Sequence, residues 1–141
     1  WRRDMKKLLA LLLLSPLVLA QDTTLDCSAS SISFPDMSPT SLDNSSFMTL
    51  TINVDKKLVD VFINTWGSAP NIGYEVQGKQ MIEFEVTTHT MGNEALINRF
   101  SLNRISGELV EKIGVYSVPS RRFVRNISTT YGTCVKKKSL F

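Results

Sequence analysis

The feature that most restricts the fold of this chain is a two-residue alternation of apolar and polar side chains. It is clearest over residues 81–89, where Ile82, Phe84 and Val86 alternate with Glu83, Glu85 and Thr87. Residues 47–54 repeat the pattern, with Met48, Leu50, Ile52 and Val54 in alternate positions. Because successive side chains of a β-strand point to opposite faces, this period predicts strands with one buried face and one solvated face.

Further strands are predicted where β-branched and aromatic residues stand between turn signals. Besides 47–54 and 81–89, these segments are 31–34, 58–63, 72–76, 95–103, 108–113, 115–118 and 123–134. Most of the Ser-rich segment 28–46, and the segment 64–71 with its Gly and Pro, are predicted as loops. With no amphipathic helix of useful length after residue 21, the chain is predicted to be all-β, an antiparallel meander of about seven or eight strands.

A meander of this size needs some form of closure. A flat sheet would leave an apolar face and two unpaired strand edges in water. Folding into a small barrel, closed or partly open, covers both, and a two-layer sandwich is the alternative. We therefore expect a barrel.

The first twenty residues have the layout of a helical signal peptide. Met5 and two Lys residues precede an apolar run of thirteen residues, 8–20, and the small residue Ala20 ends it before Gln21. Because a membrane-spanning helix needs about twenty apolar residues, this layout favours a leader, cleaved between Ala20 and Gln21, over an anchor. Residues 1–4 are expected to be upstream or mis-called residues that precede the native start.

The chain is predicted to divide into five segments. They are the upstream residues 1–4, the signal peptide 5–20, a Ser-rich segment 21–46 with the first Cys, an antiparallel β domain 47–134 and a basic tail 135–141. No transmembrane segment is expected in the mature chain.

Charge argues against a nucleic-acid partner. The full chain has a formal net charge of +3, but residues 1–20 hold four of its basic residues and one of its acidic residues, which leaves twelve of each sign. A neutral mature chain lacks the general positive field of a nucleic-acid-binding domain, so no specific nucleic-acid binding is expected.

The two cysteines, Cys27 and Cys134, allow one connectivity within the chain. An exported protein meets an oxidising compartment in which such a pair can form a disulfide, and two free thiols are the alternative. No pair of residues has the spacing of zinc ligands, so no metal site is predicted.

Few residues are candidates for chemistry. His89 is the only histidine, and Glu83 and Glu85 share one face of a strand, where they could act as an acid/base pair or bind a cation. A solvated strand face is the favoured interpretation of all three. Because no catalytic, phosphate-binding or metal motif is present, no catalytic residue and no cofactor is predicted.

Two other groups of residues are candidates for binding. Trp66 and Tyr74 flank the predicted loop and could form the rim of a binding site, although core packing is the favoured fate of Tyr74. Two basic clusters, Arg121, Arg122 and Arg125, and then Lys136 to Lys138, could meet an anionic partner such as lipid head groups. A solubilising edge and tail is the alternative interpretation of the basic residues.

Three segments, the leader MKKLLALLLLSPLVLA, the hairpin FSLNRISGEL and the ending YGTCVKKKSLF, resemble a family of short, uncharacterised exported β-rich proteins of open-ocean bacteria. In that family an early Cys precedes a β-rich middle and a Gly-x-Cys near the end. The resemblance implies a disulfide between Cys27 and Cys134. It carries no assigned activity and no active residue.

The sequence thus favours a periplasmic or secreted β module without enzymatic activity, which binds a small ligand, an envelope component or a protein. A small hydrolase that uses Glu83, Glu85 or His89 and a structural envelope protein are the alternatives. A ligand-binding barrel predicts an interior cavity near Trp66 and Tyr74, whereas a protein-binding module predicts a packed interior and an apolar or basic outer patch.

Overall fold

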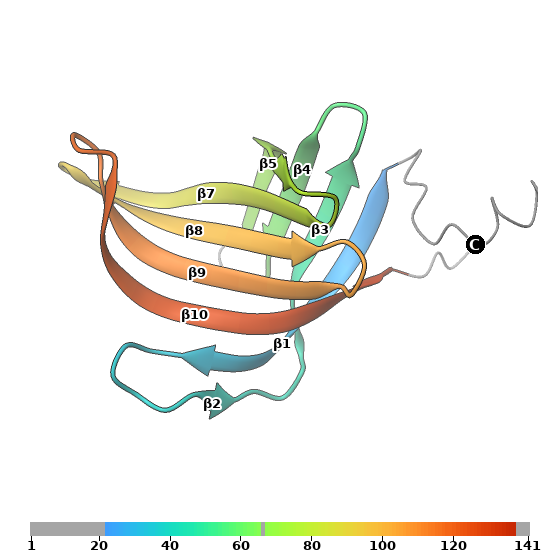
Figure 1. Cartoon of the computed structure of the whole chain (residues 1–141), viewed down its shortest axis with the longest axis horizontal. Helices are drawn as coiled ribbons and strands as arrows, with labels where there is room; N and C mark the ends of the chain where they lie inside the picture. Colours follow the sequence, from blue (N-terminus) through green and yellow to red (C-terminus); the bar gives the residue numbers. More distant parts are fainter. Residues whose placement is uncertain (1–21, 66, 138–141) are drawn as a thin grey trace, which may run out of the picture.

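The computed structural model of the protein describes residues 22–65 and 67–137. Within these residues the chain forms ten strands and no helix (Figure 1). The strands are β1 Thr23–Ser33, β2 Thr40–Ser41, β3 Ser46–Asn53, β4 Leu58–Ile63, β5 Gly67–Gly73, β6 Glu75–Gln77, β7 Met81–Met91, β8 Glu94–Asn103, β9 Glu108–Ser117 and β10 Arg122–Lys136. The predicted signal peptide, residues 1–4, Trp66 and residues 138–141 lie outside the described residues.

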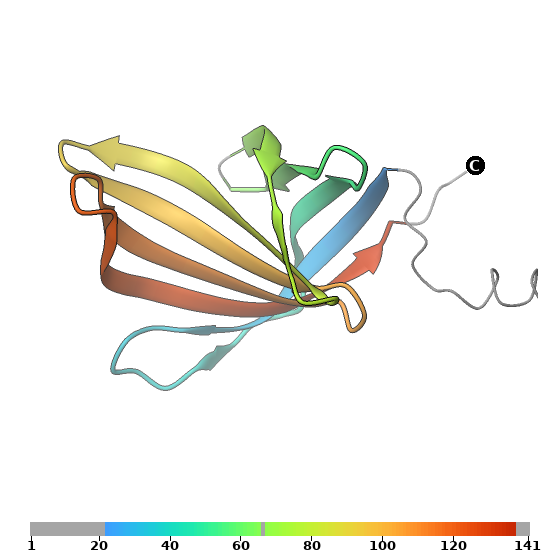
Figure 2. The same cartoon turned by 45° about the horizontal axis from the view of Figure 1, so that its top comes forward.

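All ten strands belong to one antiparallel sheet with the order β5-β4-β3-β1-β10-β9-β8-β7-β6, and β2 pairs with β1 alone. Two meanders, β3 to β5 and β6 to β10, are joined because the first long strand pairs with the last one. The sheet curls into a nearly closed barrel, with one seam between β5 and β6 that no ladder seals (Figures 1 and 2). The predicted all-β barrel is confirmed, with ten strands in place of seven or eight.

The largest difference from the sequence prediction is β1. Residues 28–30 were predicted as part of a loop, but they belong to an eleven-residue strand that lies between β3 and β10. The loop prediction was wrong here because pairing on both sides satisfies the backbone of the strand, which outweighs the weak strand propensity of its Ser residues. Small side chains also suit this position, since Gly132 of β10 packs against the backbone of Ser28.

The second difference is β5, which occupies most of the predicted loop 64–71. It pairs with β4 through a register shift between Val59 and Val61, and it forms one edge of the sheet. Pro70 is compatible with this position, because an edge strand does not need every N–H for a ladder. Pro70 therefore also discourages the pairing of this edge with another chain.

Inside the barrel, the alternating residues of the sequence form the core. Met48, Leu50 and Ile52 of β3 are at most 2% exposed, and β4 and β7 contribute their own alternate residues. The rings of Phe84 and Phe100, directly paired across β7 and β8, stack with their centroids 4.9 Å apart. The period of two therefore predicted the correct buried face of β3 and of β7.

A disulfide joins Cys27 to Cys134, which face each other as paired residues of β1 and β10. Their Cα atoms are 4.0 Å apart, and both side chains are buried in the core. The bond closes a loop across 107 positions. In the chain-entropy model such a loop stabilises the folded state by roughly 4 to 5 kcal/mol.

One carboxyl group lies on the buried face of β9. Glu111 is 6% exposed, sits between Phe100 and Thr130 of the neighbouring strands, and accepts a 3.4 Å hydrogen bond from the Asn98 side chain. Burial raises the pKa of Glu111 above its usual value, and the hydrogen bond from Asn98 partly opposes the shift. The charged form of Glu111 is therefore less favoured in the folded state than in the unfolded chain.

We expect Glu111→Gln to raise the free energy of unfolding above that of the parent protein by more at neutral pH than at acidic pH. Because the folded pKa of Glu111 is raised, the parent protein loses stability as pH rises from the unfolded pKa through the folded one, and the variant lacks this loss. The measurement is the free energy of urea unfolding of both proteins between pH 4 and pH 8. Glu108→Gln, on the exposed face of the same strand, is the matched control, and an equally pH-dependent difference for both variants would contradict the assignment.

Candidate ligand-binding cavity

A cavity of about 400 Å³ opens at the end of the barrel where β1 begins and β10 ends. Its floor is the apolar end of the core, formed by Ile52, Ile82 and Leu102, each at most 2% exposed. Leu25 of β1 and the exposed Ile105 of the β8–β9 turn form apolar walls. The volume lies within the range of small-molecule sites.

The β8–β9 turn that forms one wall is held by its own side chains. The Asn103 carboxamide oxygen accepts hydrogen bonds from the backbone N–H groups of Ile105 at 2.9 Å and Ser106 at 3.1 Å. The Ser106 hydroxyl accepts a third bond from the N–H of Glu108. An Asn at the start of a turn is suited to this role because its short side chain reaches the following N–H groups.

The same turn is attached to the disulfide region. The Cys134 N–H donates a 2.8 Å hydrogen bond to the carbonyl of Gly107, which has a φ of 76°. A Cβ added to Gly107 would lie 2.5 Å from the Cys134 carbonyl oxygen, so only glycine permits this close approach. The cavity wall is thereby fixed against the strand that carries the disulfide.

The rim of the cavity carries positive charge. Arg104 and Lys136 are the ionisable side chains among the described residues that line the cavity, and no carboxylate is among them. Arg104 is also connected to the β6–β7 turn, since its guanidinium donates to the Lys79 carbonyl and its N–H donates to the Gln80 carbonyl at 2.7 Å. An apolar floor below a basic rim suits an amphipathic anion.

The structure places the two predicted rim aromatics differently. Tyr74 lies between β5 and β6, is 7% exposed and belongs to the core cluster, so the structure shows the core packing that the sequence favoured for it. Burial raises the pKa of the Tyr74 phenol, and the positive charge of Arg104 partly opposes this. Tyr74 does not line the cavity, and Trp66 lies outside the described residues.

A second, more polar cleft of about 580 Å³ follows the seam of the barrel. It brings together Glu83 and Glu85 of β7, with Asn71 to Gly73 of β5 on the other side. Glu85 pairs with Arg99 at 2.7 Å, and Glu83 accepts a 3.4 Å hydrogen bond from Ser101. His89 is not among the described residues that line the cleft, and it lies beyond a register shift in β7.

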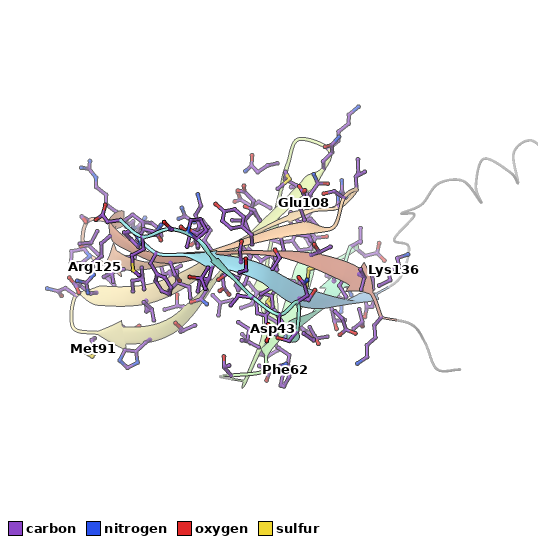
Figure 3. All side chains as sticks on the ribbon, turned by 90° about the horizontal axis from the view of Figure 1, so that it is seen from below. Asp43, Phe62, Met91, Glu108, Arg125 and Lys136 are labelled. Carbon is purple, nitrogen blue, oxygen red and sulfur yellow. A yellow bond between two sulfur atoms is a disulfide. The ribbon has the colours of Figure 1, made fainter. Side chains whose placement is uncertain are left out.

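The described residues of the two predicted basic clusters lie at opposite ends of β10, and Lys138 lies outside the described residues. Arg121, Arg122 and Arg125 are exposed at the β9–β10 hairpin, whereas Lys136 reaches the cavity rim. Figure 3 shows Arg125 and Lys136 at the two ends of the molecule. Lys136 belongs to the predicted basic tail and Arg104 to the hairpin FSLNRISGEL, but neither sequence pattern indicates that the two residues share a cavity.

Comparisons with known proteins do not assign the chain to a family. No family model, no curated protein and no solved structure matches this chain. In the described part of the chain, no helix has the length and apolar character needed to cross a bilayer. The disulfide fits a protein of an extracellular or periplasmic compartment.

Substituting Gly107 tests the attachment of the cavity wall. We expect Gly107→Ala to destabilise the protein by roughly 1 to 3 kcal/mol more than Gly92→Ala, because the added methyl group meets the Cys134 carbonyl. Gly92 is the matched control, since it also has a positive φ, 58°, but has open space around it. The measurement is urea unfolding, and equal losses of stability for the two variants would contradict the close approach.

Proposed function

We propose that the protein is a binding module without enzymatic activity and that the barrel-end cavity binds a small amphipathic anion. In this proposal the apolar part of the ligand lies on Ile52, Ile82 and Leu102, and its anionic group lies near Arg104 and Lys136. The single observation that carries the proposal is the combination of an apolar floor with a rim whose charges are both positive.

Physical chemistry supports this pairing of ligand and cavity. Removing apolar surface from water contributes about 25 cal/mol per Å² and is not specific for the shape of the ligand. A carboxylate, sulfate or phosphate group adds orientation, because Arg and Lys donate charge-assisted hydrogen bonds to anionic oxygens. The fixed β8–β9 turn limits the reorganisation that would otherwise weaken binding.

The seam cleft supports the hydrolase alternative less well. Glu83 and Glu85 line it together, but Glu85 is engaged in the ion pair with Arg99 and the histidine lies elsewhere on β7. Glu111, the buried carboxyl group of β9, does not line this cleft. Binding at the barrel end is therefore the function that we propose.

The binding proposal is tested with decanoate and decanol as probes, by isothermal titration calorimetry. We expect decanoate to bind and the double variant Arg104→Gln, Lys136→Gln to weaken its affinity about tenfold or more, with little change for the neutral decanol. Lys112→Gln, an exposed charge on β9, is the matched control.

A second variant tests the apolar wall of the cavity independently of the charged residues at its rim. Leu25→Trp places a larger side chain in the apolar wall and is expected to weaken both probes. Failure of the parent protein to bind either probe, or equal decanoate binding by the double variant and the Lys112→Gln control, would contradict the proposed site.

We further propose that the protein is exported to the periplasm or secreted, with cleavage between Ala20 and Gln21, as in the exported family that it resembles. The disulfide supports an oxidising destination. We expect intact mass spectrometry of the protein recovered from the periplasm of a bacterial host to give a chain that begins at Gln21, two hydrogens lighter than after reduction. A retained leader or two free thiols would contradict export.

A further inference from the structure

The end of the molecule farthest from the cavity carries exposed apolar side chains on two neighbouring hairpins. The β7–β8 and β9–β10 turns lie side by side in Figures 1 and 2, and the Val118 N–H donates a 2.8 Å hydrogen bond to the Asn93 carbonyl across them. Met91 is 70% exposed, Val124 54% and Val118 49%. Three large apolar side chains at one projecting end mark an interaction surface.

Three arginines accompany these apolar side chains. Arg121, Arg122 and Arg125 are exposed, and none of them forms an ion pair with a carboxylate of the described residues. Glu94 is the one acidic residue in the two turn segments, 89–94 and 117–127, so these two turns carry net positive charge. We call Met91, Val118, Val124, Arg121, Arg122 and Arg125 the hairpin-tip surface.

We propose that the hairpin-tip surface docks on an anionic lipid bilayer. The arginines contact the phosphate groups of the lipids, and Met91 and Val118 enter the interface between head groups and acyl chains. This combination is the one by which peripheral proteins bind anionic membranes, since apolar insertion and electrostatic attraction add to each other.

The shape of this end favours a bilayer over a protein or nucleic acid. Two projecting turns insert a few side chains into a fluid interface, whereas a stable protein complex buries roughly 800 Å² of complementary surface on each partner. A nucleic-acid backbone would use the arginines and leave the apolar tips in water. Only the bilayer satisfies both parts of the surface.

Docking in this way also orients the molecule. Figure 3 shows Met91 and Arg125 at one end and Lys136, on the cavity rim, at the other. The cavity therefore opens away from the membrane and stays accessible from the aqueous side. This orientation is independent of which ligand the cavity takes.

The proposal is tested by co-sedimentation of the exported protein with phosphatidylglycerol vesicles and with phosphatidylcholine vesicles. We expect binding to the anionic vesicles, weakened when the salt concentration is raised. The triple variant Arg121→Gln, Arg122→Gln, Arg125→Gln is expected to lose affinity by about fivefold per arginine, or roughly a hundredfold in all. The matched control neutralises three exposed lysines elsewhere, Lys56→Gln, Lys79→Gln and Lys112→Gln, and is expected to bind far more tightly than the triple arginine variant.

A tryptophan placed at the tip reports insertion directly. We expect Val118→Trp to show a blue-shifted emission with anionic vesicles and quenching by brominated lipids, while Val135→Trp, an exposed position near the other end of β10, shows neither. Equal binding by the two triple variants would overturn the proposal. So would binding to soluble polyglutamate as tight as to vesicles with no blue shift at Val118→Trp, because that result would describe general anion binding.

Discussion

The pairing of β1 with β10 is the interaction on which the rest of the structure depends. It joins the two meanders, brings the ends of the described chain together and places the disulfide between directly paired residues. Without this ladder the chain would form two open sheets, each with an apolar face in water. The cavity depends on it as well, because Leu25 and Lys136, which both line the cavity, are partners in the same ladder.

The same pairing supplies part of the cavity's rim. Ile52, Ile82 and Leu102 of the core form the apolar floor, while β1 and β10 bring Thr23 and Lys136 to the mouth. The β8–β9 turn completes the wall because its Gly107 docks on the backbone of Cys134. Residues far apart in the sequence thus form one site through a single ladder and one tight turn.

Much of the fold follows from the sequence, but little of the site does. The alternation in 47–54 and 81–89 predicted the buried faces of β3 and β7, since that period depends only on backbone geometry. Residues 31–33 of β1 fall in a predicted strand, but residues 28–30 did not, because their backbone is ordered by partners about a hundred positions away. Arg104 was recognisable as a turn residue and Lys136 as a tail residue, yet their approach to one cavity is set by the curl of the sheet, which no local pattern encodes.

The strands of the barrel are not held together equally strongly around its circumference. The disulfide fastens the middle of the strand order, while the seam between β5 and β6 lies at its two ends. The edge strands β5 and β6 lack a partner on one side, so we expect local opening to begin at the seam. The covalently joined strands β1 and β10 lie away from the seam, so the disulfide holds together the part of the barrel that the open edges do not reach.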